Sequence, residues 1–261
     1  MDFLKRGLAP ISSEGWKFID ERAGEVIKAN LSARRFAAVV GPMGQSTEAV
    51  GSGKMQVYTK GESQFGVYKV QPLVEQRIHF KMNRWDLDNV DRGAKDIDTS
   101  SLDTAVKKAA LFEEAAIYEG LEEAGIIGLL HSSEHEALDF GKTFDETMSA
   151  LVCATSILKR SFADAPYALV ISPDKWNYLN LIGKDSGFIK HISESLHIKI
   201  IVSNNIKNAY LVPMDNENIE ITIGQDFGLG FQSYTSKEVE LFITSSFTFR
   251  VLDPSLVVVF K

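Results

Sequence analysis

A glycine-punctuated segment between Gly41 and Pro72 most constrains how this chain folds. Six glycines interrupt short pieces rich in β-branched and aromatic residues, such as 55–58 and 66–70. The pattern predicts a long, extended hairpin with few side chains to anchor it in a core. Because two strands without a packed face are marginally stable in water, we expect the segment to find its partner surface on another chain.

Two helices are predicted by the spacing of their apolar residues. The first begins at the Ser12-Ser13 pair, which offers N-cap oxygens, and should end near Asn30. The second and most regular covers 101–123, with Gly125 as its stop. Its apolar stripe needs a sheet to cover it, so this helix should be the spine of a main domain.

Beyond Gly128 short helices and strands alternate, which predicts a compact α/β subdomain inserted in the chain. The expected helices are 143–160, 174–182 and 189–195, and the expected strands are 167–171, 198–203, 209–213 and 219–223. The last segments, 239–249 and 256–260, are strongly β in character. We expect both to return to the main domain and cover the long helix.

Composition excludes several classes of protein. A chain of 261 residues with 44% hydrophobic and 24% charged residues can bury a core without a metal or disulfide. A net charge of -7 argues against nucleic-acid binding, because no basic surplus exists to displace counterions. No run of 18 or more apolar residues predicts a membrane span. No apolar stretch follows the first charges as in a secretory signal, so we expect a cytoplasmic protein.

Residues that could carry chemistry do not form a known pattern. The acidic cluster of the long helix lacks the histidines of a di-iron site, so a solvated face is expected. The cluster comprises Glu113, Glu114, Glu119, Glu122 and Glu123. His131 and His135 lack the zinc-protease order, and the string Asp86, Asp88, Asp91 lacks the glycine and glutamate of a calcium loop.

No nucleophile or nucleotide-binding loop is predicted either. Cys153, the one cysteine, lies between apolar residues of a predicted helix and is expected to be a small buried hydrophobe. The glycine pairs 51–53 and 228–230 match neither a dinucleotide fingerprint nor a phosphate loop. No Gly-x-Ser-x-Gly elbow supports a serine hydrolase.

Several segments resemble the encapsulin shell proteins (family 1, linocin-like). The most specific are MDFLKRGLAPI at 1–11, WDLDNVDRG at 85–93 and FITSSFTF at 242–249. The similarity continues, in the same order along the chain, at 31–36, 41–42, 71–75, 116–120 and 224–226.

The resemblance implies an α+β fold of the HK97 phage-capsid type, with a peripheral domain, an axial domain and an extended loop. On this chain the peripheral domain would begin with an arm and helix over 1–45 and continue over 72–135 with the spine helix. The extended loop would be 46–71 and the axial domain 136–222. Residues 223–261 would be the return strands.

The resemblance also implies that copies of the chain assemble into a hollow icosahedral compartment, of about 60 subunits in the simplest (T=1) case. No nucleic acid, membrane, metal or catalytic residue is implied. Cargo enzymes would be enclosed through a C-terminal targeting peptide. In the family these are commonly a ferritin-like iron oxidase or a dye-decolorising peroxidase, which links the compartment to iron storage and oxidative stress.

In the family the cargo peptide docks between the N-terminal helix and late peripheral strands. The matching positions here are Val26, Ile27, Leu31 and Arg34 with Phe227, Leu229, Phe231 and Tyr234. Plain core packing is the alternative for each apolar member. Ala37 and Ala38 stand where many relatives carry a polar or acidic residue beside the groove.

Two further sites are implied by the resemblance. No cofactor is required, but some relatives bind flavin on a tryptophan and an arginine that match Trp85 and Arg77; packing at a subunit contact is the favoured alternative for Trp85. The segment that matches the vertex pore would admit ions and small molecules, unless it is an ordinary surface turn. Its residues are Gly183, Lys184, Asp185, Ser186, Gly187 and Phe188.

We therefore expect a shell protein that has no catalytic centre and acts by containment. Two rival functions remain open at this point. An enzyme, for example a peptidase, would show turnover by the isolated protein. A viral capsid protein would package nucleic acid, against which the acidic pI of about 5.3 weighs.

Overall fold

The computed structural model describes residues 3–182 and 187–261. Contacts divide the chain into two compact units. Unit 1 comprises Met1–Asn30, Gly41–Glu113 and Thr222–Thr248, and unit 2 comprises Leu31–Val40, Glu114–Ile221 and Phe249–Lys261. This division differs from the expected domains, because unit 2 includes 31–40, 114–135 and 249–261 in addition to the expected insertion.

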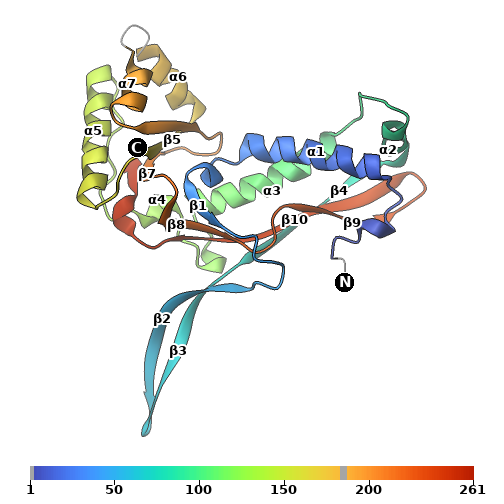
Figure 1. Ribbon diagram of the computed structural model, residues 1–261, viewed down its shortest axis with the longest axis horizontal. Helices are drawn as coiled ribbons and strands as arrows, with labels where there is room; N and C mark the ends of the chain where they lie inside the picture. Colours follow the sequence, from blue (N-terminus) through green and yellow to red (C-terminus); the bar gives the residue numbers. More distant parts are fainter. Residues whose placement is uncertain (1–2, 183–186) are drawn as a thin grey trace. The chain divides into compact units, whose positions relative to one another are not determined.

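Helix α1 (Ser13–Asn30) begins where the sequence predicts. The Ser12 hydroxyl accepts a hydrogen bond from the Gly15 amide at 2.9 Å and so caps the first turn. Within unit 1, α1 runs alongside α3 (Figure 1), and Arg22 donates to the Asp103 carboxylate at 2.9 and 2.6 Å. Two parallel charge-assisted hydrogen bonds of this kind fix the two helices in register.

The long helix α3 (Ser100–Tyr118) is shorter than the predicted 101–123. It ends because Gly120 adopts a left-handed backbone with φ 101°, and its amide bonds the Ala115 carbonyl at 3.2 Å. The following residues form a 3-10 turn, Glu122–Ala124, before Gly125. The stop signal was therefore Gly120 rather than Gly125.

The core of unit 1 lies between these helices and a sheet. Strand β10 (Glu238–Val251) pairs antiparallel with β4 (Val74–Asn83) on one side and β9 (Gly228–Tyr234) on the other. The buried stripe of α3 packs in the same cluster as Leu241 and Ile243 of β10. The prediction that strands around 239–249 cover the long helix is confirmed.

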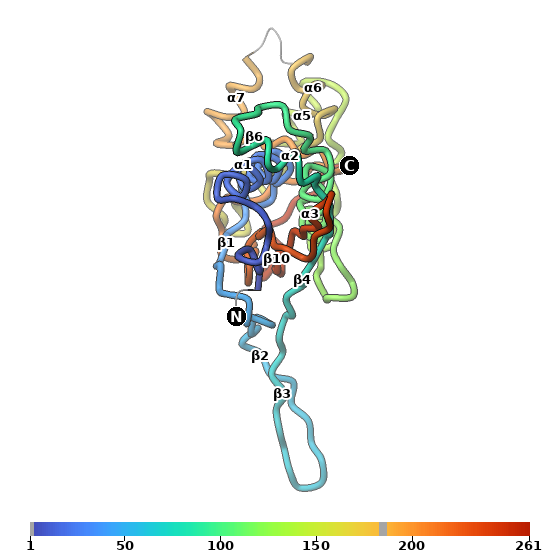
Figure 2. Tube along the Cα trace, turned by 90° about the vertical axis from the view of Figure 1, so that its right-hand side faces the viewer, coloured from blue at the N-terminus to red at the C-terminus, as the bar shows by residue number. Residues whose placement is uncertain are grey.

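Strands β2 (Ala49–Lys60) and β3 (Ser63–Pro72) form the predicted hairpin. Figures 1 and 2 show the two strands running together to a common tip. Every residue from 51 to 70 is exposed. The hairpin therefore has no packed face within the subunit.

Unit 2 is built on a four-stranded sheet of order β11-β7-β5-β6. Strands β5 and β6 are parallel, and β7 is antiparallel to both β5 and β11. Helix α5 packs on β7 and β11, whereas α7 packs on β6 and α6. The bounds are α5 Phe144–Arg160, β5 Tyr167–Ile171, α6 Pro173–Ile182, α7 Phe188–Glu194, β6 Ile198–Val202, β7 Ala209–Pro213 and β11 Val258–Phe260.

The last strand departs from the prediction. Segment 256–260 was expected to cover the long helix, but β11 pairs with β7 in the sheet of unit 2. The Phe260 ring packs edge-on against Phe140 at 5.5 Å. Because β11 is buried on both faces, its apolar composition alone gave no indication of which sheet it joins.

Among the described residues no helix is long and apolar enough to cross a membrane.

The remaining helices and strands are short. The bounds are η1 Arg6–Leu8, η2 Ala33–Arg35, β1 Ala37–Val40, α2 Arg84–Asp91, α4 Leu129–Ser132, β8 Asn216–Ile223 and η4 Pro254–Leu256.

Candidate functional site

The N-terminal arm of unit 1 covers one edge of β9. The Phe231 amide donates to the Leu4 carbonyl at 2.8 Å, and Arg6 Nε donates to the Leu229 carbonyl at 2.8 Å. The other edge of β9 is already paired with β10. Because an uncovered strand edge invites pairing with other chains, the arm protects β9 with residues of its own chain.

Arg6 also fastens the arm to α1. Its guanidinium donates to the Asp20 carboxylate at 2.8 Å and lies 4.3 Å from the centre of the Trp16 ring. An ion pair and a cation–π contact at one side chain are each worth up to about 1 kcal/mol at a partly exposed site. The arm, α1 and β9 therefore form one connected surface of unit 1.

This surface contains most of the predicted cargo-binding positions. Val26 and Ile27 in the last turns of α1, and Phe227 just before β9, are half-buried against the core of unit 1. Leu229 and Phe231 belong to that core, with 3% and 7% of their surface exposed. The half-buried side chains are therefore the ones that present apolar surface to solvent.

Tyr234 lies at the far end of β9 and is 57% exposed. Its ring is 6.2 Å from that of Phe231 and 5.6 Å from the Arg84 guanidinium. Arg84 in turn donates to the Thr235 carbonyl at 3.2 Å. Tyr234 is thus an exposed aromatic beside a cation rather than part of the apolar core.

The other two predicted cargo-binding positions belong to unit 2. Leu31 is buried, with 8% of its surface exposed, and Arg34 in the 3-10 turn that follows is half-buried. Next to Leu31, the Ser32 and Ala33 amides both donate to the Glu114 carboxylate at 2.9 Å. This carboxylate fixes the backbone from which Leu31 and Arg34 project.

The acidic cluster of the long helix is solvated only in part: Glu119, Glu122 and Glu123 are exposed as expected, whereas the prediction was wrong for the first two members. Glu113 and Glu114 are both fully buried. The Tyr118 hydroxyl lies 2.7 Å from the Ser32 hydroxyl, which also bonds the Glu114 carboxylate. Burial, and then the charge of Glu114, raise the pKa of Tyr118 well above its ordinary value.

The two predicted flavin-binding residues do not meet within one subunit. Trp85 lies in the first turn of α2 and is 66% exposed, with the Arg92 guanidinium 5.8 Å from its ring. Arg77 lies six residues before the end of β4, which is about 20 Å along an extended strand. Its guanidinium is 4.8 Å from the Phe3 ring and 4.7 Å from the Phe242 ring.

The predicted pore segment lies mostly outside the described residues, because 183–186 are not among them. Gly187, with φ 63°, precedes α7. The Phe188 ring is 1% exposed and packs 4.8 Å from that of Phe144. Of the predicted pore residues that the structure describes, only Gly187 is exposed.

The described residues hold no group of three or more His, Cys, Asp and Glu that could bind a metal ion. His135 Nε2 lies 2.9 Å from the Ser255 carbonyl, and His131 is exposed on α4. Cys153, expected to be buried, is exposed on α5. Its flanking apolar residues do not all face inward, because Val152 is also 44% exposed.

Sequence comparisons agree over nearly the whole chain. The Linocin_M18 family, described as "Encapsulating protein for peroxidase", matches residues 1–248. The type 1 encapsulin shell protein of Brevibacterium linens is 32% identical over 97% of this chain and 96% of that relative. The type 1 encapsulin shell protein of Rhodospirillum rubrum is 29% identical over 99% of this chain and 96% of that relative.

Solved structures share the fold. The virus-like particle of Pyrococcus furiosus has a TM-score of 0.68 at 16% identity, covering 93% of this chain and 98% of its own. The holo-SrpI encapsulin complex of Synechococcus elongatus PCC 7942 has a TM-score of 0.55 at 10% identity, covering 87% and 84%. The capsid of Myoviridae phage XM1 has a TM-score of 0.57 at 8% identity, covering 85% and 88%. The expected α+β fold of the HK97 capsid type is confirmed.

Proposed function

The chain belongs to the family of encapsulin shell proteins, and from this premise we propose that many copies close into a hollow icosahedral particle that encloses cargo enzymes in the bacterial cytoplasm. Proteins of this family form multimeric, capsid-like assemblies. The simplest closed shell has T=1 symmetry and about 60 copies.

The β2–β3 hairpin is the observation that carries this proposal. Strand side chains alternate between two faces, and both faces of the hairpin carry exposed apolar side chains. Met55 pairs with Tyr68 on one face, and Tyr58 pairs with Phe65 on the other, their rings 5.7 Å apart. All four side chains are between 43% and 74% exposed. Exposed apolar surface of this extent is typical of a protein–protein interface.

Assembly is tested on the purified protein by native mass spectrometry and negative-stain electron microscopy. We expect hollow particles of uniform diameter and a mass of about 60 subunits. A well-folded monomer under native conditions would contradict the proposal. Hollow particles of another size would still support a closed shell and would overturn only the proposed number of subunits.

Cargo docking is assigned to the apolar surface of Val26, Ile27 and Phe227. A peptide that buries two or three aliphatic side chains there gains roughly 1.5–3 kcal/mol for each. Ordering a disordered tail costs several kcal/mol, so a single peptide binds weakly. An oligomeric cargo that presents many tails gains affinity through its effective concentration.

The cargo is a ferritin-like iron oxidase or a dye-decolorising peroxidase. The family description, which names peroxidase encapsulation, supports the second. Mass spectrometry of proteins that co-purify with the particle identifies the cargo directly. A particle that carries only nucleic acid would instead favour a viral capsid.

The docking surface is tested by Ile27→Asp, which places a charge on the half-buried position. We expect intact particles with about tenfold less cargo per shell, since one buried aliphatic contact of about 1.4 kcal/mol or more is lost. Ala29→Asp, which adds the same charge at an exposed neighbouring position, should load normally. If particles of both variants carried equal amounts of cargo, the assignment of this surface as the cargo-peptide site would be wrong. Leu229 and Phe231 are unsuitable targets because truncating either would disturb the core.

The shell has no catalytic centre of its own, and pores admit ions and small molecules to the enclosed enzyme. Empty particles should therefore show no turnover, whereas loaded particles show that of the cargo. The exposed Trp85 is assigned to a contact between subunits. Flavin absorbance that survives purification and disappears in Trp85→Ala would replace that assignment with a flavin site.

A further inference from the structure

Phe162 is an apolar residue in an unusual position. It follows the last turn of α5, is 96% exposed, and has a left-handed backbone with φ 60°. Its amide still bonds the Lys159 carbonyl at 3.1 Å. Glycine is the residue that favours this conformation at the end of a helix. The chain thus holds a large aromatic side chain in solvent where a glycine would be less strained.

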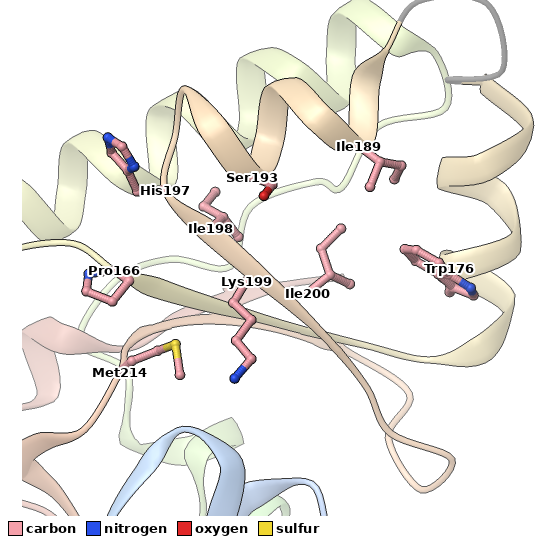
Figure 3. A pocket seen from close by; sticks show the side chains of 9 residues that line it. All are labelled: Pro166, Trp176, Ile189, Ser193, His197, Ile198, Lys199, Ile200 and Met214. Atoms are coloured by element: carbon pink, nitrogen blue, oxygen red, sulfur yellow. The ribbon is translucent and has the colours of Figure 1, made fainter.

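A groove beside the edge strand β6 has the complementary character. Its volume is about 560 Å³. Figure 3 shows Ile198 and Ile200 of β6 pointing toward α7, with Trp176 of α6 and Ile189 of α7 around the same space. The lining is completed by Pro166, Ser193, His197, Lys199 and Met214.

The groove and the segment around Phe162 are complementary: an apolar ring can enter an apolar groove, and a carboxylate beside the ring can meet a lysine beside the groove. A phenylalanine ring is an apolar side chain that gains by burying 150–250 Å². In the groove Ile198 is buried, and apolar surface is offered by the half-buried side chains of Trp176, Ile189 and Ile200. Asp164, two residues after Phe162, is also exposed. Lys199, exposed on the groove wall, supplies the opposite charge.

We propose that Phe162 of one subunit inserts into the groove beside β6 of a second copy, with Asp164 paired to Lys199. Phe162 and the groove both belong to unit 2, so every subunit carries one of each. A contact between two different patches is heterologous, and repeating it generates a closed ring when the rotation closes. The inference rests on the proposed shell function and adds a specific contact to it.

The first test is Phe162→Gly. Glycine adopts the left-handed backbone without strain, so the subunit should fold normally. We expect the shell to dissociate at a subunit concentration at least tenfold higher than the parent shell does. Leu252→Ala, at another exposed apolar residue of unit 2, should leave assembly unchanged. Equal assembly of the Phe162→Gly variant and the parent would overturn the proposal.

The second test is chemical cross-linking of Ser161→Cys combined with Ser193→Cys, in a Cys153→Ser background that removes the native thiol and leaves Phe162 in place. A short bifunctional maleimide should yield a ladder of covalent multimers from assembled particles. Each single-cysteine variant should remain monomeric on a denaturing gel. Dimers from Ser193→Cys alone would show two grooves facing each other and would overturn the insertion. Particles that form without any ladder would do the same.

The two levels of inference fail separately. If the parent protein forms no particles, the shell function itself is wrong. If the parent assembles and either test gives the contrary result, only the Phe162 contact is wrong.

Discussion

The Arg6 guanidinium lies 4.3 Å from the centre of the Trp16 ring and donates to the Leu229 carbonyl at 2.8 Å. One side chain thus connects the N-terminal arm, helix α1 and strand β9. Other contacts of the arm are the hydrogen bond from the Phe231 amide to the Leu4 carbonyl and the packing of the Phe3 ring, which lies 6.2 Å from the Phe242 ring.

Replacing Arg6 by alanine should release the arm from β9. The loss of one cation–π contact, one surface ion pair and one hydrogen bond together amounts to about 1–2 kcal/mol. Hydrogen exchange at the Phe231 amide, which the arm covers, should become about tenfold faster. Lys17→Ala, at an exposed site on α1, is the control. Unchanged exchange at Phe231 would mean that the arm is held by other contacts.

Replacing Glu114 by glutamine should destabilise unit 2. A buried carboxylate that accepts from two backbone amides is lost, and hydrogen bonds to charged groups contribute about 1.5–3 kcal/mol each. We expect a fall of about 3 kcal/mol in the free energy of unfolding, measured in denaturant. Glu123→Gln, at an exposed position of the same acidic cluster, should change it by under about 0.5 kcal/mol. Similar values for both variants would contradict the role given to Glu114.

The stability of unit 2 should fall in alkali. Burial, and then the charge of Glu119, raise the pKa of Tyr210 to about 12. A raised pKa means that the folded state holds the proton more tightly, so the stabilisation is complete below the ordinary pKa of about 10 and is lost as the pH rises through 12. Unfolding in denaturant at several values between pH 9 and about 12 should show this decline. Tyr210→Phe should show a shallower one, and identical slopes would refute the assignment.

Gly128 should tolerate no side chain. A Cβ there would lie 2.3 Å from the Gly120 amide nitrogen and 2.5 Å from the Glu119 carbonyl carbon. Since both are backbone atoms that cannot rotate away, Gly128→Ala should lower the free energy of unfolding by about 3 kcal/mol or prevent folding. Gly24→Ala, where a Cβ meets nothing within 4 Å, should be neutral or stabilise α1 by about 0.5–1 kcal/mol. Thermal unfolding compares the two, and a stable Gly128→Ala protein would contradict the close approach.

Deleting residues 51–66 should abolish closed shells. The deletion removes most of the exposed apolar pairs of the hairpin while leaving the core of unit 1, to which none of these residues contributes. We expect soluble subunits or open fragments in electron micrographs. The substitution Glu62→Ser at the hairpin tip should still give closed particles. Normal shells from the deletion variant would show that the hairpin is dispensable.

Much of the fold followed from local patterns. The bounds of α1 and most elements of unit 2 agree with the prediction within a few residues, because each carries its own caps and apolar period. The end of α3 and the pairing of β11 did not follow. The end of α3 depends on the close backbone approach of Gly120 to Gly128, and the pairing of β11 depends on which strand edge is free. Both depend on tertiary structure, which local sequence patterns do not reveal.

The candidate site was harder to predict from sequence. Leu229 and Phe231 are apolar, as residues of a peptide-binding groove would be, but both are buried in the core of unit 1. Glu114 is charged and was expected on a solvated face, yet its buried carboxylate accepts hydrogen bonds from two backbone amides. Cys153 shows the reverse error, since apolar neighbours on a helix do not reveal which way one position faces. The quoted family segments, rather than periodicity, gave the correct function class.

The pairing of β2 with β3 has a consequence for the order of events during assembly. All its contacts are local in sequence, and hairpins of this kind close in about 1–10 μs, far faster than two proteins meet at micromolar concentration. The hairpin therefore closes on its own backbone ladder and on the contact between the Tyr58 and Phe65 rings before a neighbour arrives. Each encounter therefore meets a hairpin that is already formed, and the rate of particle growth should depend on how often subunits meet rather than on how fast this hairpin closes.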